Sequence, residues 1–153
     1  MPRFFRRFAE GRFDLDDLRL QTGLLARFIA EASGKYGFDP DKLIAVGYSN
    51  GANIAASLLL QEPGVLAGAV LFRPMTPFVP ESPPKLGNVS ALLAAGRRDP
   101  IVAPEQTSRL AEILKEAGAR VSIHWHEGGH ELGQDDIDAA RNWIHNYSAV
   151  KSV

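Results

Sequence analysis

The stretch Leu43-Ile44-Ala45-Val46-Gly47-Tyr48-Ser49-Asn50-Gly51-Ala52 decides the fold of this chain. A short apolar run precedes a G-x-S-x-G motif, and a helix-forming stretch to Leu60 follows it. This order of strand, turn and helix is the context in which the motif forms a nucleophile elbow, a very tight turn that exposes a serine hydroxyl. We expect Gly47 and Gly51 to leave room for close packing of the strand against the helix. The motif alone is frequent by chance, so the prediction depends on the rest of the chain.

Residues downstream of the motif supply the partners that a nucleophilic serine needs. A serine hydroxyl is a weak nucleophile near neutral pH and requires a histidine base that a carboxylate orients. The apolar run 91–95 predicts a buried strand, and Asp99 stands on the loop that leaves it. Residues 121–126 predict another strand, followed by a glycine-rich loop that carries His130. We therefore predict Ser49 as nucleophile, Asp99 as acid and His130 as base.

The order of these residues and the alternation of elements predict the fold class. Serine, then acid, then histidine is the α/β-hydrolase order and differs from that of chymotrypsin and subtilisin. Because helical crossovers make neighbouring strands parallel, we predict a helix-flanked, mostly parallel sheet of about four strands in one domain over residues 1–153. Besides the elbow, we expect helices over about 14–36, 104–117 and 134–147 and strands over 66–72, 91–95 and 121–126. The first helix should cover the sheet with Leu18, Leu24, Leu25, Phe28, Ile29 and Ala32.

Several segments together resemble one known family. They are residues 1–7, 37–43, 47–57, 73–75, 95–101 and 124–126 with 129–130. In these segments the chain is similar to the phospholipase/carboxylesterase branch of the α/β-hydrolases, small serine esterases that include bacterial hydroquinone-resistance hydrolases. The resemblance implies hydrolysis of small-molecule carboxylic esters through an acyl-enzyme on Ser49, with Asp99 and His130, and with neither a metal nor an organic cofactor.

One departure from this family concerns the oxyanion hole. Members of the family open with two or more strands and a histidine- and glycine-rich loop before anything that resembles Met1, and this sequence contains none of them, so we expect an amino-terminally truncated α/β-hydrolase fold. In this fold the hole takes one donor from the backbone N–H after the nucleophile, here Asn50, and the other from that earlier loop. Loss of one donor costs about 100- to 1,000-fold in turnover, roughly 3 to 4 kcal/mol. The alternatives to an active esterase are an impaired hydrolase fragment that acts as a binding or interaction module, and a non-hydrolytic small-molecule receptor.

The same departure bears on the edge of the sheet. In the family, the earlier strands lie beside the strand that leads into the elbow, and an uncovered apolar edge invites pairing with another chain. Ile44, Ala45 and Val46 carry no charge that would oppose such pairing. We expect one of three outcomes: self-association into a homo-oligomer through this edge, poor solubility, or a sequence that starts at an internal methionine of a longer protein.

Composition is typical of a compact globular chain and excludes several classes. Its 153 residues are 45% hydrophobic and 23% charged, and the net charge of −1 gives no global field for nucleic acid or an acidic membrane. The basic residues near the N-terminus suggest a targeting peptide or nucleic-acid arm, but Glu10 and Asp14 interrupt them. No run of about 18 apolar residues predicts a transmembrane helix. The absence of cysteine is compatible with the cytoplasm, where we expect the protein.

The remaining candidates are pocket residues and other titratable groups. Phe4, Phe5, Tyr48 and Met75 are predicted to contact substrate, because ester sites are mostly apolar, although such residues also serve as satellite core. Arg73 would meet an anionic substrate group or stand solvated. His124 and His126 share one strand face, yet two histidines without cysteine are too few for a typical zinc site, so no metal is predicted. Carboxylates at the start of the last helix are expected to cap it (Asp135, Asp136 and Asp138).

Overall fold

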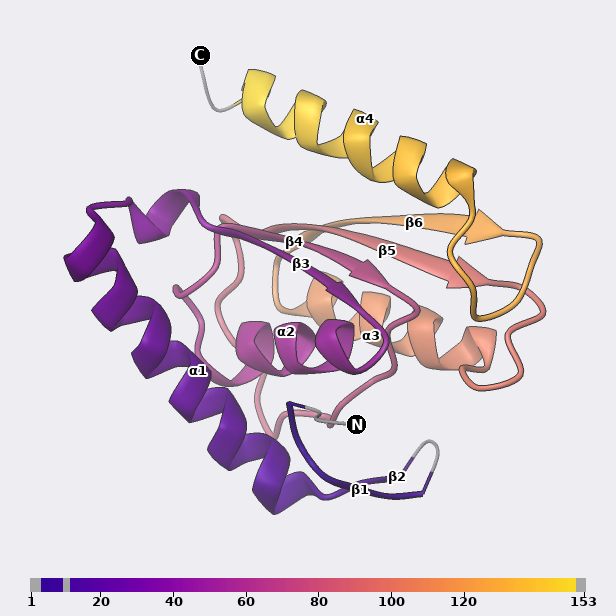
Figure 1. The fold of residues 1–153 in the computed structure, drawn as a ribbon, viewed down its shortest axis with the longest axis horizontal. Coiled ribbons are helices and arrows are strands. Elements are labelled where there is room, and N and C mark those ends of the chain that lie inside the picture. The colour runs from indigo at the N-terminus through magenta and orange to yellow at the C-terminus, as the bar shows by residue number, and fades with distance from the viewer. Residues whose placement is uncertain (1–3, 10–11, 151–153) are drawn as a thin grey trace.

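The computed structural model describes residues 4–9 and 12–150, in which strands and helices alternate (Figure 1). A small hairpin opens the described chain and was not predicted; its strands are β1 (Arg7–Ala9) and β2 (Arg12–Phe13). The other elements match the expected ones to within a few residues, apart from the short 3-10 helix η1. They are α1 (Leu15–Tyr36), η1 (Pro40–Lys42), β3 (Ile44–Tyr48), α2 (Asn50–Gln61), β4 (Gly68–Phe72), β5 (Ser90–Gly96), α3 (Pro104–Glu116), β6 (Arg120–His126) and α4 (Gln134–Val150).

The main sheet is parallel, as predicted. Its strand order is β3-β4-β5-β6, and all three neighbouring pairs run parallel in continuous register. Each crossover contains a helix or a long loop, which is what parallel neighbours require. All four strands therefore end at the same edge of the sheet, and the loops that follow them meet there. In the described chain β3 is an outer strand of this sheet.

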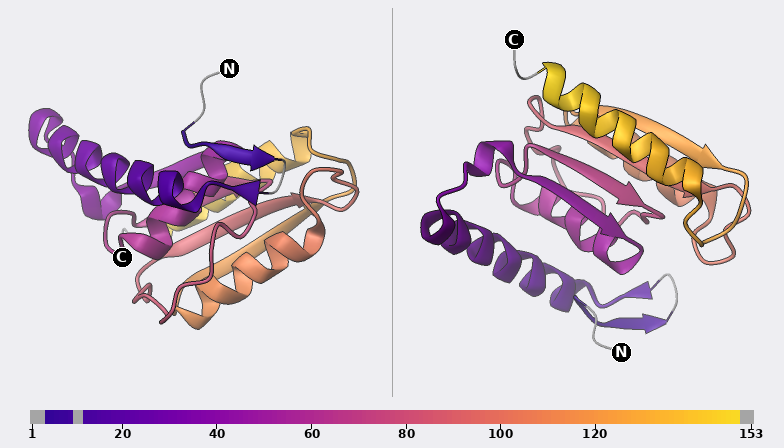
Figure 2. Two further views of the ribbon diagram at one scale, coloured as in Figure 1. Left: turned by 90° about the horizontal axis from the view of Figure 1, so that it is seen from below. Right: turned by 45° about the horizontal axis from the view of Figure 1, so that its top comes forward.

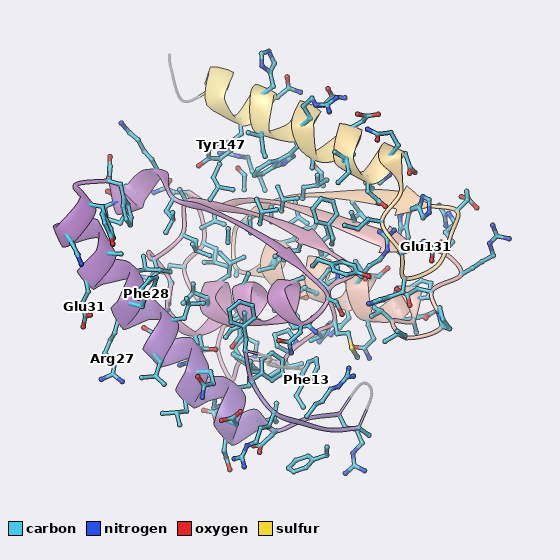
Figure 3. All side chains as sticks on the ribbon, in the orientation of Figure 1. Phe13, Arg27, Phe28, Glu31, Glu131 and Tyr147 are labelled. Carbon is cyan, nitrogen blue, oxygen red and sulfur yellow. The ribbon has the colours of Figure 1, made fainter. Side chains whose placement is uncertain are left out.

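Two helical layers cover the faces of the sheet (Figures 1 and 2). On one face α2 and α3 pack against alternate residues of β4 and β5 such as Ala69, Leu71 and Leu93. On the other face α4 packs Ala140 and Trp143 against the intervening residues, such as Val70. Strands that are buried on both faces read as continuous apolar runs, and every residue of β4 and β5 is buried. Tyr147 points from α4 toward the sheet, and its hydroxyl donates to Ala67 O at 3.1 Å (Figure 3).

Helix α1 lies against α2 rather than over the sheet, which corrects the expected role of its apolar face (Figure 1). Leu18 is fully buried, and Leu25 and Ile29 pack against the main core. Leu24 and Phe28 are 42% and 63% exposed. At 3.6 residues per turn these two positions lie roughly 80 to 120° around the helix from Leu18. The predicted face was therefore too wide, and the contact with α2 uses a narrower stripe.

Within residues 4–9 and 12–150, no helix has the length and apolar character needed to cross a membrane. The cytoplasmic location and the extent of the domain stay predictions.

Candidate active site

Ser49 occupies the sharp turn between β3 and α2. Its φ of 53° and ψ of −113° are unusual for a residue with a side chain. The turn is held by its backbone N–H, which donates to Phe72 O at 2.9 Å. A Cβ added to Gly47 would lie 2.5 Å from Gly51 O, so the predicted steric role of Gly47 is confirmed. The same expectation for Gly51 is wrong, because a Cβ there would meet Phe4 Cε2 at an ordinary 3.7 Å.

Asp99 stands on the loop after β5, where its side chain is fully buried. Its Oδ1 accepts hydrogen bonds from the backbone N–H groups of Ile101, at 2.8 Å, and Val102, at 3.0 Å. These two donors fix the orientation of the carboxylate. Its other oxygen, Oδ2, is thereby directed toward the loop between β6 and α4.

His130, on that loop, connects Asp99 with Ser49. Its Nδ1 lies 2.8 Å from Asp99 Oδ2, and its Nε2 lies 3.0 Å from Ser49 Oγ. Since an ionised carboxylate only accepts hydrogen bonds, Nδ1 donates to Asp99, which leaves Nε2 of the neutral ring to accept from the serine hydroxyl. The structure therefore brings together the three predicted side chains from loops at one edge of the sheet. In chemical terms, this arrangement can take a proton from the hydroxyl.

The backbone around His130 is held by side chains from neighbouring strand ends. Tyr48 OH donates to His130 O at 3.0 Å, and the two rings lie 5.4 Å apart. A phenol with a pKa of about 10 is protonated at neutral pH, and burial raises the pKa of the Tyr48 hydroxyl further, so it remains a donor. Arg73 donates from Nε to Gly129 O at 3.1 Å and from Nη2 to Glu131 O at 2.6 Å. Glu131 itself lies on this loop (Figure 3).

Arg73 is fully buried, so both roles expected for it, contact with an anionic substrate group and a solvated position, are wrong. It forms a bidentate ion pair with Asp136, at 3.0 and 2.7 Å, and the side chain of Asp136 is also fully buried. Sequence reasoning predicted neither the burial of Arg73 nor its pairing with Asp136. The available signal was the position of Arg73 directly after a buried strand, at the same sheet edge as Ser49 and Asp99.

Asn50 begins α2, directly beside the serine. The first N–H groups of a helix have no partner within the helix and carry the positive end of its dipole. The backbone N–H of Asn50 is therefore suited to stabilise negative charge near Ser49 Oγ. Its side chain has another role, because Asn50 Oδ1 accepts from the backbone N–H of Phe4 at 3.0 Å.

Comparison with known proteins agrees with this geometry. The model of the dienelactone hydrolase family matches residues 13–148. The chain belongs to the dienelactone hydrolase family. Over 143 residues it is 44% identical to "Putative hydrolase MhqD" of Bacillus subtilis (strain 168), a match that covers 94% of this chain and 72% of that protein.

Solved structures of relatives share the fold of this family member. A carboxylesterase from Bacillus cereus is 44% identical, with a TM-score of 0.93 over 95% of this chain and 69% of that one. A carboxylesterase from Mesorhizobium loti is 32% identical, with a TM-score of 0.87 over 94% of this chain and 68% of that one. The α/β-hydrolase fold is thus confirmed, and the relatives support a hydrolase of the esterase type. Membership of the phospholipase/carboxylesterase branch stays a prediction.

The predicted substrate contacts fall into two groups. Phe4 is 55% exposed beside the start of α2, and Tyr48 is 42% exposed, so contact of these side chains with substrate stays a prediction. Phe5 is 2% exposed and packs in a small core with Leu18 and Ile54, which gives its ring a structural role. Met75 is also buried, and its backbone N–H donates to Asn53 Oδ1.

A cluster of histidines and aspartates lies where β6 and α4 meet. Ligand atoms of His126, Asp135 and Asp136 lie within 4.8 Å of one another. Asp135 Oδ2 is shared by His126 Nδ1, at 2.8 Å, and His124 Nε2, at 3.3 Å, and the hydrogen bond with His126 is the main cause of a lowered Asp135 pKa. Asp136 is already bound to Arg73 and to the N–H of Gly133. These contacts form a hydrogen-bonded network. Asp136 was expected only to cap α4, and it also pairs with Arg73.

Proposed function

We propose that this chain is a serine hydrolase that cleaves carboxylic esters of small molecules through an acyl-enzyme on Ser49. The observation that carries the proposal is the continuous pair of contacts from Ser49 Oγ to His130 Nε2, at 3.0 Å, and from His130 Nδ1 to Asp99 Oδ2, at 2.8 Å. Membership of a hydrolase family and the carboxylesterases among the solved relatives support the same chemistry.

In the acylation step, Ser49 Oγ attacks the acyl carbon of the ester while His130 Nε2 takes the hydroxyl proton. The carbonyl oxygen becomes an oxyanion, which the backbone N–H of Asn50 at the start of α2 stabilises. Asp99 holds the imidazole in the tautomer that accepts at Nε2, and its charge stabilises the imidazolium that forms. Collapse of the intermediate breaks the bond to the alcohol oxygen, to which His130 returns the proton.

In the deacylation step, water replaces the departed alcohol. His130 Nε2 takes a proton from the water as its oxygen attacks the acyl carbon, and the second tetrahedral intermediate expels Ser49 Oγ. The proton then returns to the serine, which restores the starting enzyme and releases the carboxylic acid.

A fluorophosphonate probe and a short p-nitrophenyl ester test the proposal. Labelling and ester cleavage are expected for the parent chain and are expected to be lost in Ser49→Ala and His130→Ala. Ser122→Ala and His145→Ala are matched controls, since both residues are exposed and belong to β6 and α4 away from the triad. A parent chain that is neither labelled nor active would refute the esterase proposal.

One observation favours the homo-oligomer expected from the sequence, in which two copies of the chain pair through the edge of the sheet. β3 is an outer strand in the described chain, and Val46 on it is 62% exposed. An apolar groove of about 280 Å³ runs beside this strand, lined by residues that include Ile29 of α1 and Ile54 of α2. Unpaired apolar edges are templates for strand pairing. We propose that a second copy pairs here, and a monomer by sedimentation at micromolar concentration would rule this out.

A further inference from the structure

Arg73 has a backbone conformation that few side-chain-bearing residues adopt. It directly follows β4, its φ is 55°, and its guanidinium is fully buried. Its own N–H donates to Ala94 O at 2.7 Å, which fixes this residue to β5. A strained, buried cation is retained where its surroundings hold it firmly, and such residues gather at functional sites.

The guanidinium binds the loop on both sides of His130. It donates to the carbonyls of residues 129 and 131 and forms the bidentate pair with Asp136. An arginine suits this position because its planar fork offers five donors in fixed directions, whereas a lysine ammonium is a single point charge. Asp136 also accepts from the N–H of Gly133, so the pair ties the start of α4 to the end of the same loop.

The loop that carries His130 needs contacts from other elements to fix its conformation, because it is rich in glycine. Gly128 and Gly129 precede His130, and glycine backbone loses the most conformational freedom when it is ordered. The loop passes so close to Gly96 that a Cβ there would clash with the Gly128 and Gly129 carbonyls. Position and orientation of the imidazole therefore depend on the groups that bind the backbone of this loop, together with Asp99 at Nδ1.

We propose that Arg73, oriented by Asp136, is a positioning residue that holds His130 Nε2 within hydrogen-bond reach of Ser49 Oγ. The expected effect on turnover rests on the proposed function. The restraint of the His130 imidazole does not, because it can be measured in the resting protein. Arg73 itself is sealed from solvent and contacts the loop, so it acts through His130.

Three variants test this role. Arg73→Lys keeps the charge and loses the fork, and Arg73→Met removes both. Arg73→Met with Asp136→Leu replaces the buried pair by apolar side chains, an exchange that frequently leaves stability unchanged. Arg141→Lys is the matched control, since Arg141 forms an exposed pair with Asp138 on α4. Steady-state kinetics on a p-nitrophenyl ester and thermal unfolding are measured for each.

For folded Arg73 variants we expect kcat to fall about 100-fold, as for a displacement of a catalytic group by about 1 Å, with KM changed less than about twofold. The control should match the parent chain. If the double variant has the melting temperature of the parent chain but the low kcat of the single variants, the loss of turnover comes from the position of His130 and not from lower stability. Retention of full kcat in that variant would overturn the inference.

A second readout does not depend on turnover. The proton on His130 Nδ1 is hydrogen-bonded to Asp99. We expect it to give a slowly exchanging downfield NMR resonance, which is absent from His130→Ala. It should be lost from the Arg73 variants and kept in Arg141→Lys. If the parent chain cleaves no ester, the proposed function fails while this resonance still decides the inference. Persistence of the resonance in the folded double variant would refute the positioning role.

Discussion

Gly47→Ala offers the sharpest test of the elbow, because the neighbours of the added methyl group cannot turn aside. Its Cβ would lie 2.5 Å from Gly51 O, 2.6 Å from Gly51 C and 2.7 Å from Ala52 N. All three are backbone atoms of the first turn of α2. To restore an ordinary contact of 3.4 Å, strand and helix must separate by about 0.9 Å.

The magnitude follows from that displacement. Overpacking of this kind costs about 1 to 3 kcal/mol of stability, which for a chain of this size lowers the melting temperature by roughly 2 to 12 °C. Ser49 lies between Gly47 and α2, so its hydroxyl moves relative to His130. A misplacement of about 1 Å costs about 100-fold in turnover. We therefore expect a folded, destabilised protein that is nearly inactive.

Gly51→Ala is the matched control at the other glycine of the motif. The added methyl group would meet Phe4 Cε2 at 3.7 Å, an ordinary contact, and residue 51 is helical. Alanine at a helical position that accepts it raises stability by about 0.5 kcal/mol. The two variants of one motif are thus expected to change the melting temperature in opposite directions.

The assay combines thermal unfolding with the rate of fluorophosphonate labelling, which reports the reactivity of Ser49 directly. Equal losses in both variants would show that the motif tolerates no side chain at either glycine, against the geometry. Parent-like stability and labelling in Gly47→Ala would refute the steric argument altogether.

Three further outcomes are expected. Asp99→Asn keeps an acceptor for the N–H groups of Ile101 and Val102 but favours the wrong tautomer of His130, so kcat should fall about 10⁴-fold with little change in melting temperature. Burial opposes ionisation of Asp136, yet hydrogen bonds from Arg73 and Gly133 outweigh this effect and lower the pKa of Asp136. The ionised carboxylate therefore stabilises the fold above about pH 4, and this stabilisation is lost as pH falls through the lowered pKa. Acid titration of unfolding should show a smaller loss of stability in the double variant Arg73→Met with Asp136→Leu than in the parent chain. Val46→Lys places a charge on the exposed edge strand and should reduce any self-association seen by sedimentation, whereas unchanged association would locate the interface elsewhere.

The fold could be predicted because its signals are local in sequence. Buried parallel strands read as apolar runs, and the strand, turn and helix around Ser49 lie within one short stretch. Asp99 and His130 could be predicted because each stands on a loop that follows a predicted strand, and because serine, acid and histidine come in the α/β-hydrolase order. These inferences required the order of elements and no knowledge of side-chain contacts.

The packing of α1 could not be predicted in the same way. An apolar stripe indicates that a helix has a buried face but does not identify what covers it. Leu24 and Phe28 look equivalent to Leu25 and Ile29 in sequence, yet the contact with α2 buries the latter pair more deeply. The register between two helices depends on their crossing, which composition does not specify.

Arg73 illustrates a deeper limit of sequence reasoning, and the limit has a physical origin. An arginine is mostly exposed in proteins, and the cost of burying its charge is met only when partners from distant parts of the chain converge on it. Here those partners lie 56 to 63 residues away, on the loop of His130 and the first turn of α4. A catalytic triad can be inferred from residue types because its chemistry requires them. The residues that hold its histidine in place are selected by their position in space and not by their type. They can therefore be identified only once the three-dimensional arrangement of the loops is known.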